Sequence, residues 1–381
     1  MRTVNPSAEA PHQVHGLSGD AMAPDWPPLT LAELARVFRH YPGHGAPHAI
    51  LWHSPRPLSA AALVETDAGT VFAKRHHASV RSHAVLQEEH AFAAHLRGRG
   101  IPIPSIHANA DGQSALAQGA WVWELHAAAE GIDLYRDVPS WTPPHDPAHA
   151  RSAGAMLARL HQAAQGFDAP QRATHLLVAR TELIEADDPL AALVAQRPQR
   201  PALASWLDSH PWQQALSATL APFQPAVAAR AAAQPRLWTH GDWHVSNLFW
   251  SQAAPCASVS AVLDFGLCAR SFALFDLATA IERNAIAWLE PGDARARPAI
   301  AQALLDGYRE VRTLEPEDLA LVADLLPVVH LDFALSEVEY FAGVTRNFEH
   351  ARIAWQDFLI GHAHWFRTHA GQRFLQTLRA S

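Results

Sequence analysis

Two short stretches in the second half of the chain carry side chains that could hold a metal ion and act on a hydroxyl group. The first, LWTHGDWHVSNLFW, contains Asp242 and, five residues later, Asn247. The second, VSAVLDFGL, is an apolar run that ends in Asp264 beside a glycine. Carboxylate and amide oxygens are ligands for Mg2+, and a separate carboxylate can orient an attacking hydroxyl. These residue types and spacings indicate phosphoryl-transfer chemistry.

Phosphoryl transfer also needs a cation on the phosphates, and Lys74 in the stretch TVFAKRHH is the candidate. The chain has 29 lysines and arginines in 381 residues, and Lys74 is the only lysine among them. An ammonium is a compact charge that fits where space is tight, whereas a guanidinium is a planar fork. We therefore expect Lys74 to reach phosphate oxygens. The alternative is a surface lysine that sequence drift has not replaced.

A carboxylate downstream of Lys74 could hold this ammonium in place. Glu89 falls on one face of the next expected helix, together with apolar residues at helical spacing. A buried carboxylate is costly unless a cation meets it, and Lys74 is the nearest candidate along the chain. In its strand Lys74 shares a face with Phe72, which makes Phe72 a candidate nucleotide contact. The alternative for Lys74 and Glu89 is a plain ion pair in the core.

The elements that must position these residues change character along the chain. A Pro-, His- and Ser-rich start predicts a disordered tail. A capping-box pattern at Thr30 and Glu33 then opens a short helix, and two strand-like runs follow, joined by Asp-Ala-Gly. A long helix ending at Gly100 and the strand WVWELHA come next. Beyond them the pattern is mostly helical, at about 146–166, 201–233, 299–313 and 315–377 in pieces, with RPQRPAL as a loop.

This order predicts an α+β fold with a small strand-rich lobe, a larger helical lobe and a cleft between them. We expect a disordered tail at 1–28, an N-lobe that grips the nucleotide phosphates at 29–122, and a C-lobe at 123–381. The C-lobe would carry the catalytic loop, the metal site and the acceptor pocket.

The composition excludes several classes of partner. The net charge is −8 and the arginines are scattered, so no basic stripe indicates nucleic acid or an anionic membrane. Two cysteines, no secretory h-region and no apolar run long enough to cross a bilayer predict a cytoplasmic protein with small-molecule partners. The 25 histidines are spread out without HExxH or cysteine pairing, which argues against a dedicated zinc site.

HGDWHVSN and LDFG together resemble the HGD…N and DFG-type motifs of the aminoglycoside phosphotransferase, choline kinase and type II homoserine kinase superfamily, relatives of the protein kinases. Five residue types occur in the same order as in that superfamily, and the resemblance covers about residues 45–285. It implies a protein-kinase-like fold, with a small antiparallel sheet in the N-lobe, and transfer of the γ-phosphate of ATP to a hydroxyl of a small molecule.

The resemblance also implies a role for each of the five residues. Lys74 would contact the α- and β-phosphates of ATP, and Glu89 would position it. Asp242 would accept or orient the proton of the substrate hydroxyl. Asn247 and Asp264 would bind Mg2+.

Supporting roles follow from the same resemblance. His240 would brace the catalytic loop, or is merely a packed histidine, and Asp276 would be a buried hydrogen-bonding residue that supports this loop. The segment before Lys74 has no glycine-rich loop, so the backbone and hydroxyls around residues 54–59 would cover the phosphates instead. Backbone groups between Glu124 and His126 would meet the adenine edge.

The acceptor pocket is expected in the helical lobe, where acids and aromatic rings would suit an amino-bearing alcohol. The candidates are Glu282, Trp243, Trp288, Glu337, Glu339 and Tyr340. The segment 133–147 is either a lid over the cleft or a solvated connection. Two other functions are open alternatives. A compact bacterial Ser/Thr protein kinase would need a longer activation segment than LCARSFALFD, and a nucleotide-binding pseudokinase would not keep the full set of five residues.

Overall fold

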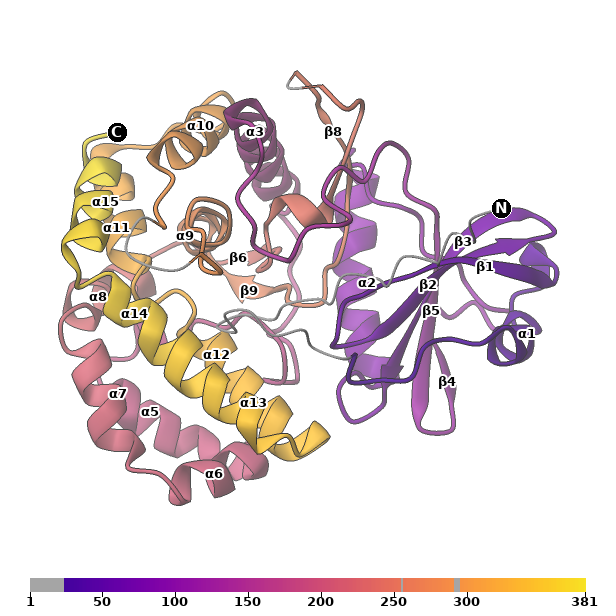
Figure 1. The fold of residues 1–381 in the computed structure, drawn as a ribbon, viewed down its shortest axis with the longest axis horizontal. Helices are drawn as coiled ribbons and strands as arrows, with labels where there is room; N and C mark the ends of the chain where they lie inside the picture. Colours follow the sequence, from indigo (N-terminus) through magenta and orange to yellow (C-terminus); the bar gives the residue numbers. More distant parts are fainter. Residues whose placement is uncertain (1–23, 255, 291–294) are drawn as a thin grey trace, which may run out of the picture.

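The computed structural model describes residues 24–254, 256–290 and 295–381, and they form two lobes (Figure 1). In the small lobe, a five-stranded antiparallel sheet has the order β1-β2-β3-β5-β4. The large lobe is mostly helical and holds two short two-stranded sheets, β6-β9 and β7-β8. The predicted α+β architecture, with a small antiparallel sheet in one lobe and mostly helices in the other, is confirmed.

The strands are β1 Pro47–His53, β2 Ala60–Thr66, β3 Gly69–His77, β4 Leu116–Gln118, β5 Trp121–Ala127, β6 Leu237–Thr239, β7 Leu248–Trp250, β8 Val259–Val262 and β9 Ala269–Ser271. The α-helices are α1 Leu31–Phe38, α2 His83–Gly98, α3 Pro147–Ala163, α4 Glu182–Glu185, α5 Pro189–Gln196, α6 Pro201–Asp208, α7 Trp212–Leu220, α8 Ala228–Ala232, α9 Ala273–Asn284, α10 Pro298–Arg309, α11 Pro316–Leu325, α12 Leu331–Glu339, α13 Phe348–Ile353, α14 His362–Trp365 and α15 His369–Arg379.

Alternation along β3 decides which residues face the cleft between the lobes. Val71 and Ala73 are buried in the small-lobe core, whereas Phe72 and Lys74 line the cavity on the other face of the sheet. Arg75 points away from Lys74, with its guanidinium 4.1 Å from the ring centre of Trp121. Because strand side chains alternate between faces, this pairing of Phe72 with Lys74 is the one that the sequence predicted.

The helices of the large lobe pack around one core, and two glycines allow the closest approach. A Cβ added at Gly154 in α3 would meet the backbone of Leu304, and one added at Gly307 in α10 would meet the backbone of Arg151. These helices lie side by side in Figure 1. Within the described residues, no helix is both long and apolar enough to cross a bilayer.

Several expectations about boundaries need correction. Of the predicted tail, residues 1–23 lie outside the described residues, but Asp25 and Pro27 make contacts to the two lobes. Pro27 O accepts from the Arg75 guanidinium, and Asp25 accepts from the hydroxyl of Tyr340 in the large lobe. Strand β5 pairs in the small-lobe sheet as far as Ala127, so the sheet continues beyond the predicted boundary at residue 122.

The sequence patterns also missed some elements. Strands β1 and β4 and helices α4 and α5 were not predicted. These strands lie at the two edges of the sheet, and β1 is only half-buried, so it lacks a clear apolar alternation. Helix α4 spans four residues and α5 spans eight, too few to establish a helical period.

Candidate active site

Two adjoining cavities lie where the lobes meet. The larger has a volume of about 320 Å3 and is lined by β3, the end of β5, and the segment after β8. The smaller has a volume of about 110 Å3 and reaches Asp242 on the loop after β6. Lys74, Asn247 and Asp264 line both cavities, so three residues far apart in the chain converge at their junction.

Lys74 and Asp264 form an ion pair at this junction. The Lys74 ammonium donates to Asp264 Oδ1 over 3.3 Å. Desolvation between the lobes would lower the pKa of Lys74, but the charges of Asp264, Glu124 and Glu89 outweigh it and hold that pKa above its ordinary value. Desolvation would likewise raise the pKa of Asp264, but the Lys74 ammonium keeps it well below its ordinary range. Both groups are therefore charged at neutral pH.

The predicted contact between Lys74 and Glu89 is corrected by the structure. The nearest cation to Glu89 is Arg172 of the large lobe, at 3.7 Å, although the Glu89 charge still favours the protonated Lys74. Glu89 is buried on the predicted face of α2 and lines the larger cavity. Lys74 was expected here because it is the nearest cation along the chain, whereas the partner comes from the other lobe.

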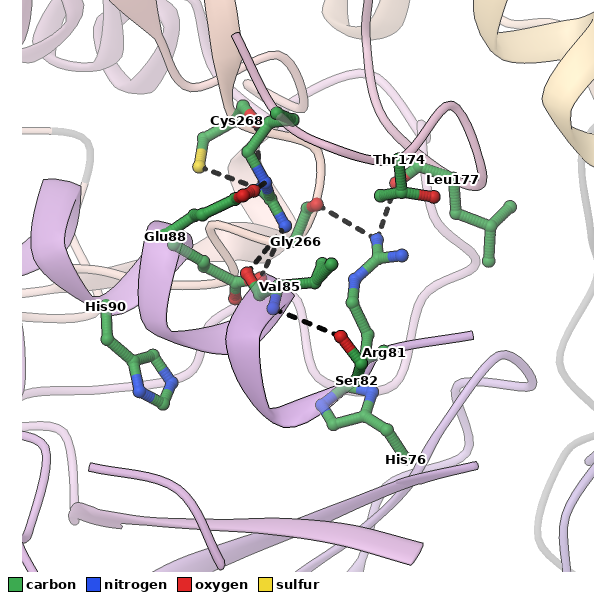
Figure 2. Close-up of polar contacts among 12 residues, drawn as sticks. His76, Arg81, Ser82, Val85, Glu88, His90, Thr174, Leu177, Gly266 and Cys268 are labelled. Carbon is green, nitrogen blue, oxygen red and sulfur yellow. Dashed lines mark hydrogen bonds and ion pairs between the residues drawn. The ribbon is translucent and has the colours of Figure 1, made fainter. Parts of the chain in front are cut away.

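Arg81 and Arg172 connect the small lobe to the segment that carries Asp264. Arg81, just before α2, donates to the carbonyls of Leu177 and Gly266 at 2.6 and 3.0 Å (Figure 2). Arg172 of the large lobe donates to Glu88 in α2 of the small lobe and to the carbonyl of Cys268. Both guanidinium groups are buried. The Asp-Phe-Gly segment is thus held between two lobes by charge-assisted hydrogen bonds.

Asp264 has a backbone conformation that few residues other than glycine adopt. Its φ is +56°, in the left-handed region that aspartate tolerates better than most side chains. The Gly266 amide donates to Oδ1 of the same carboxylate at 3.3 Å. Because Arg81 holds the carbonyl of Gly266, the strained turn keeps the Asp264 carboxylate directed at the junction of the cavities.

Asp276 of α9 holds the loop that carries Asp242 in place. The carboxylate of Asp276 is fully buried and accepts from the backbone amides of His240 and Gly241, each at 2.9 Å. Gly241 has φ +75°, and a Cβ there would lie 2.7 Å from Leu267 O, so the turn requires glycine. The supporting role predicted for Asp276 is confirmed.

His240 is buried within the same loop and does not line either cavity. Its Nε2–H donates to the carbonyl of Leu263, and its Nδ1 accepts from the amide of Asp242. With these partners the imidazole is neutral and carries its proton on Nε2. Burial lowers the pKa of His240 and so favours this neutral form. His240 therefore ties the loop to the residue before Asp264, and the geometry supports the predicted bracing.

Asp242 meets three polar neighbours. Asn247 Nδ2 donates to its carbonyl at 3.0 Å and to its Oδ2 at 3.1 Å. Its Oδ1 forms an ion pair with Arg283 of α9, and His244 Nε2 lies 3.6 Å from Oδ2. Burial lowers the pKa of His244 to about 3, so His244 is neutral. Arg283 was not predicted, although it directly follows the candidate Glu282 in the sequence.

Asn247 and Asp264 fit a hard divalent cation. Both Nδ2 hydrogen bonds of Asn247 go to Asp242, which fixes the amide so that Oδ1 is the atom left for a ligand. Asp264 contributes an ionised carboxylate on the same cavity walls. An amide oxygen and a carboxylate beside a space open to water and phosphates form the oxygen-rich donor set that Mg2+ prefers.

The loop between β1 and β2 borders both cavities. It belongs to the segment before Lys74, in which the sequence has no glycine-rich loop. Ser54, Arg56 and Ser59 line the larger cavity, and Arg56 also lines the smaller one. Asp264 and Asp133 both act electrostatically on Arg56, whose pKa burial lowers. Residues 54–59 thus border the cavities, and cover of the phosphates stays a prediction, which named only hydroxyls and backbone and not this arginine.

The predicted adenine edge needs correction. The backbone of Glu124 to His126 lies within β5 and pairs with β3, and Leu125 O accepts from His107 on the other side. The Glu124 side chain is enclosed by His76, His90 and His126. Ala128 and Ala129, past the end of the strand, line the larger cavity, so the available edge lies slightly farther along the chain.

Of the six acceptor-pocket candidates, only Glu337 lines the smaller cavity with Asp242. Glu282 is buried against His362, and Glu339 pairs with Arg200. Trp243 and Trp288 are core residues, as the sequence argument expected for most tryptophans. Tyr340 donates to Asp25. Burial raises the pKa of Glu337 to about 8.

The segment 133–147 is more than a solvated connection, although Arg136, Asp137 and His145 in it are exposed. Ser140 and Trp141 line the smaller cavity, and Asp133 and Arg136 line the larger one. Trp141 is buried and packs 5.4 Å from Phe358, between ring centres. The Arg283 guanidinium lies 4.5 Å from the Trp141 ring centre. The solvated alternative is therefore excluded, because this segment forms a wall of the site.

Comparisons with known proteins agree with this geometry. The sequence model of a phosphotransferase enzyme family matches residues 58–314, a range that contains all five residues of the predicted site. No curated protein matches the chain in sequence.

Solved structures match over nearly the whole chain. An amicoumacin kinase in complex with AMP-PNP and Ca2+ is 14% identical over 91% of this chain and 92% of its own, with a TM-score of 0.56. A microcompartment-associated aminopropanol kinase is 16% identical over 92% and 99%, with a TM-score of 0.57. An aminoglycoside phosphotransferase from Alicyclobacillus acidocaldarius is 15% identical over 93% and 97%, with a TM-score of 0.51. At these identities the likeness concerns the fold.

Proposed function

The chain belongs to the phosphotransferase enzyme family, and from that premise we propose that it transfers the γ-phosphoryl group of ATP to a hydroxyl of a compact amino-bearing molecule. One observation carries the proposal. Lys74, Asn247 and Asp264 line both cavities, while Asp242 lines only the smaller. The larger cavity would hold ATP and the smaller one the acceptor, with the γ-phosphate at the junction.

Each residue then has a task that its contacts support. Lys74 would meet phosphate oxygens, and Arg56 would cover them from the β1–β2 loop. Asp264 and Asn247 would hold Mg2+, which when bound neutralises charge on the β- and γ-phosphate oxygens. Backbone groups of residues 128 and 129 would meet adenine.

Asp242 would orient the acceptor hydroxyl. The hydroxyl oxygen forms a bond to the γ-phosphorus as the bond from phosphorus to the bridging oxygen breaks, ADP leaves, and the hydroxyl proton passes to the Asp242 carboxylate. The ion pair with Arg283 fixes the direction of this carboxylate, which would help it to orient the acceptor hydroxyl.

The acceptor is proposed to be small because the cavity at Asp242 is about 110 Å3. Glu337 supplies a carboxyl group there. Burial raises its pKa to about 8, but a neighbouring ammonium group would favour its ionised form, so this wall suits an amino-bearing acceptor. Aminopropanol kinase, a structure of similar fold, is named for such a substrate. The short connection from Gly266 to α9 leaves no room for the activation segment of a protein kinase.

Substrate-dependent ADP release tests this proposal. Amino alcohols, hydroxy amino acids, simple sugars and aminoglycosides would be compared at equal concentration with Mg-ATP. We expect turnover with one of the amino alcohols or hydroxy amino acids, and a higher KM for that acceptor in Glu337→Gln, with the KM for ATP unchanged. Turnover confined to aminoglycosides would refute the compact acceptor. ADP release independent of every acceptor would refute small-molecule transfer.

A further inference from the structure

The floor of the larger cavity contains a histidine and carboxylate cluster that phosphoryl transfer does not use. Glu124 of β5 is 1% exposed and is paired with Lys74 of the neighbouring strand β3. Three imidazoles from three different elements converge on its carboxylate, namely His76 from β3, His90 from α2, and His126 from β5. The fold thus brings together histidines that the sequence keeps far apart.

Two imidazole nitrogens meet at one oxygen of this carboxylate. His90 Nε2 lies 2.6 Å and His126 Nε2 lies 2.8 Å from the same atom, Glu124 Oε2. The candidate ligand atoms of these three residues all lie within 4.8 Å of one another. A cation placed among them would replace the two protons that the imidazoles share with Oε2, and small side-chain adjustments would give the usual metal–nitrogen distance of about 2.0–2.1 Å.

The surrounding residues would orient these ligands. His76 Nε2 lies 2.8 Å from the other oxygen, Oε1, and would hold the carboxylate so that Oε2 faces the ion. Ser114 Oγ lies 2.8 Å from His90 Nδ1 and would accept the N–H that appears there once Nε2 binds a metal. Such outer partners usually fix the ring orientation of ligating histidines.

The cluster is also accessible. His90 and Glu124 are buried, but the His126 side chain is 22% exposed, and all three line the larger cavity. Three protein ligands leave a fourth position of a tetrahedral ion open to this cavity. We propose that His90, Glu124 and His126 bind one divalent transition-metal ion of the Zn2+ class at the floor of the nucleotide cavity.

The ligand types separate this site from the Mg2+ site at Asp264. Imidazole nitrogen suits Zn2+, Co2+ and related ions, whereas Mg2+ selects oxygen ligands and keeps its water. Excess Mg2+ should therefore leave a transition metal at the histidine cluster in place.

Titration of the metal-free, full-length chain with Co2+ tests the proposal. Mg2+ is present at about 5 mM, roughly a 50-fold excess over Co2+, to occupy oxygen sites. We expect one Co2+ per chain with the visible d–d bands of a four-coordinate ion. His90→Gln and His126→Gln should abolish these bands, and His76→Gln should weaken Co2+ binding about 10- to 100-fold. The control is His48→Gln, because His48 forms an exposed pair with Asp67 and should bind Co2+ as the wild type does.

Two measurements keep the result interpretable if a variant folds poorly. X-ray absorption of the wild-type zinc-loaded chain should give a first shell of two imidazoles with oxygen, and the metal-free melting temperature reports folding of each variant. A shell without imidazole, octahedral Co2+ bands, or bands that persist in both ligand variants would overturn the proposal. These readouts need no ATP or acceptor, so they stand apart from any test of phosphoryl transfer.

Discussion

The ammonium of Lys74 lies 3.3 Å from Oδ1 of Asp264, and this contact joins β3 of the small lobe to the segment after β8 of the large lobe. The residue expected on the phosphates therefore touches the residue expected on the metal. Because both groups stay charged, their ion pair links the two sides of the cleft. Each partner is also expected to bind a ligand: Lys74 the phosphates and Asp264 the metal ion.

Lys74→Arg should impair activity although it keeps the charge. The guanidinium is larger than the ammonium and would have to fit between Asp264 and the nearby Glu124. We expect kcat/KM to fall about 10- to 100-fold, equivalent to about 1.4–2.7 kcal/mol of transition-state stabilisation. Steady-state kinetics with Mg-ATP measures this.

Lys74→Met is the matched control, because it removes the charge and keeps the length. It should lose at least as much activity as the arginine variant. Wild-type kcat/KM in Lys74→Arg would mean that the compact ammonium is not required and would contradict the interpretation of this single lysine.

Asp276→Ala should destabilise the chain and slow catalysis together. The substitution leaves the buried amides of His240 and Gly241 without their acceptor, and each unsatisfied donor costs about 1–3 kcal/mol. Urea unfolding and kcat would both be measured. Asp276→Asn keeps one acceptor oxygen, so its stability and its kcat should lie between those of the wild type and those of Asp276→Ala. An alanine variant as stable as the wild type would show that this carboxylate does not hold the loop.

Arg56→Ala should weaken nucleotide binding more than it slows turnover. The side chain lines both cavities, and losing one charge-assisted contact to phosphate is expected to raise the Kd for ATP about 10-fold. Calorimetric titration with a non-hydrolysable ATP analogue checks this. Arg56→Lys keeps the charge and should recover part of the affinity, and equal affinity in all three proteins would remove Arg56 from the site.

Stability should fall as the pH rises from about 6.5 to 8. Burial raises the pKa of Glu282 from 4.5 to about 8, so over that range the folded chain binds a proton that the unfolded chain has lost. The free energy of unfolding then declines by up to about 1.4 kcal/mol per pH unit for one such group. Glu337, with its pKa also raised to about 8 by burial, acts in the same direction.

The lower limit of this range comes from His362, whose Nδ1 lies 3.0 Å from Glu282. Burial keeps the pKa of His362 well below 6.5 and lowers the pKa of His244 to about 3 and that of His330 to about 4. Below pH 6.5 these three imidazoles are protonated only in the unfolded chain, and together they outweigh the two carboxyl groups. Denaturant unfolding at several pH values would compare the wild type with Glu282→Gln. The variant should show a shallower decline, and an identical slope would exclude Glu282 as its source.

Residues whose role depends on local periodicity were predictable from the sequence. Alternation placed Phe72 and Lys74 on the cleft face of β3, and helical spacing placed Glu89 on the buried face of α2. The partners of these residues were not predictable, because they come from the other lobe. Arg172 took the expected place of Lys74 beside Glu89, and nothing in the spacing of either residue indicates that contact.

The cavity walls illustrate the same limit. Trp141 lines the proposed acceptor site, and Arg283 lies behind its ring, only because the segment before α3 packs against α9 and α12. Asp276 was different, because its position at the start of a helix after the Asp-Phe-Gly segment belongs to the motif itself. Motifs therefore located the groups at the junction of the cavities, while tertiary packing decided what surrounds them.

The most direct test of the central claim is 31P NMR of the product formed from Mg-ATP and the acceptor that stimulates ADP release. The wild type should yield a phosphomonoester of that acceptor together with ADP. Asp242→Asn should yield no phosphomonoester while binding the ATP analogue with wild-type affinity. Inorganic phosphate as the sole phosphorus product besides ADP, or full ester formation by Asp242→Asn, would contradict the account.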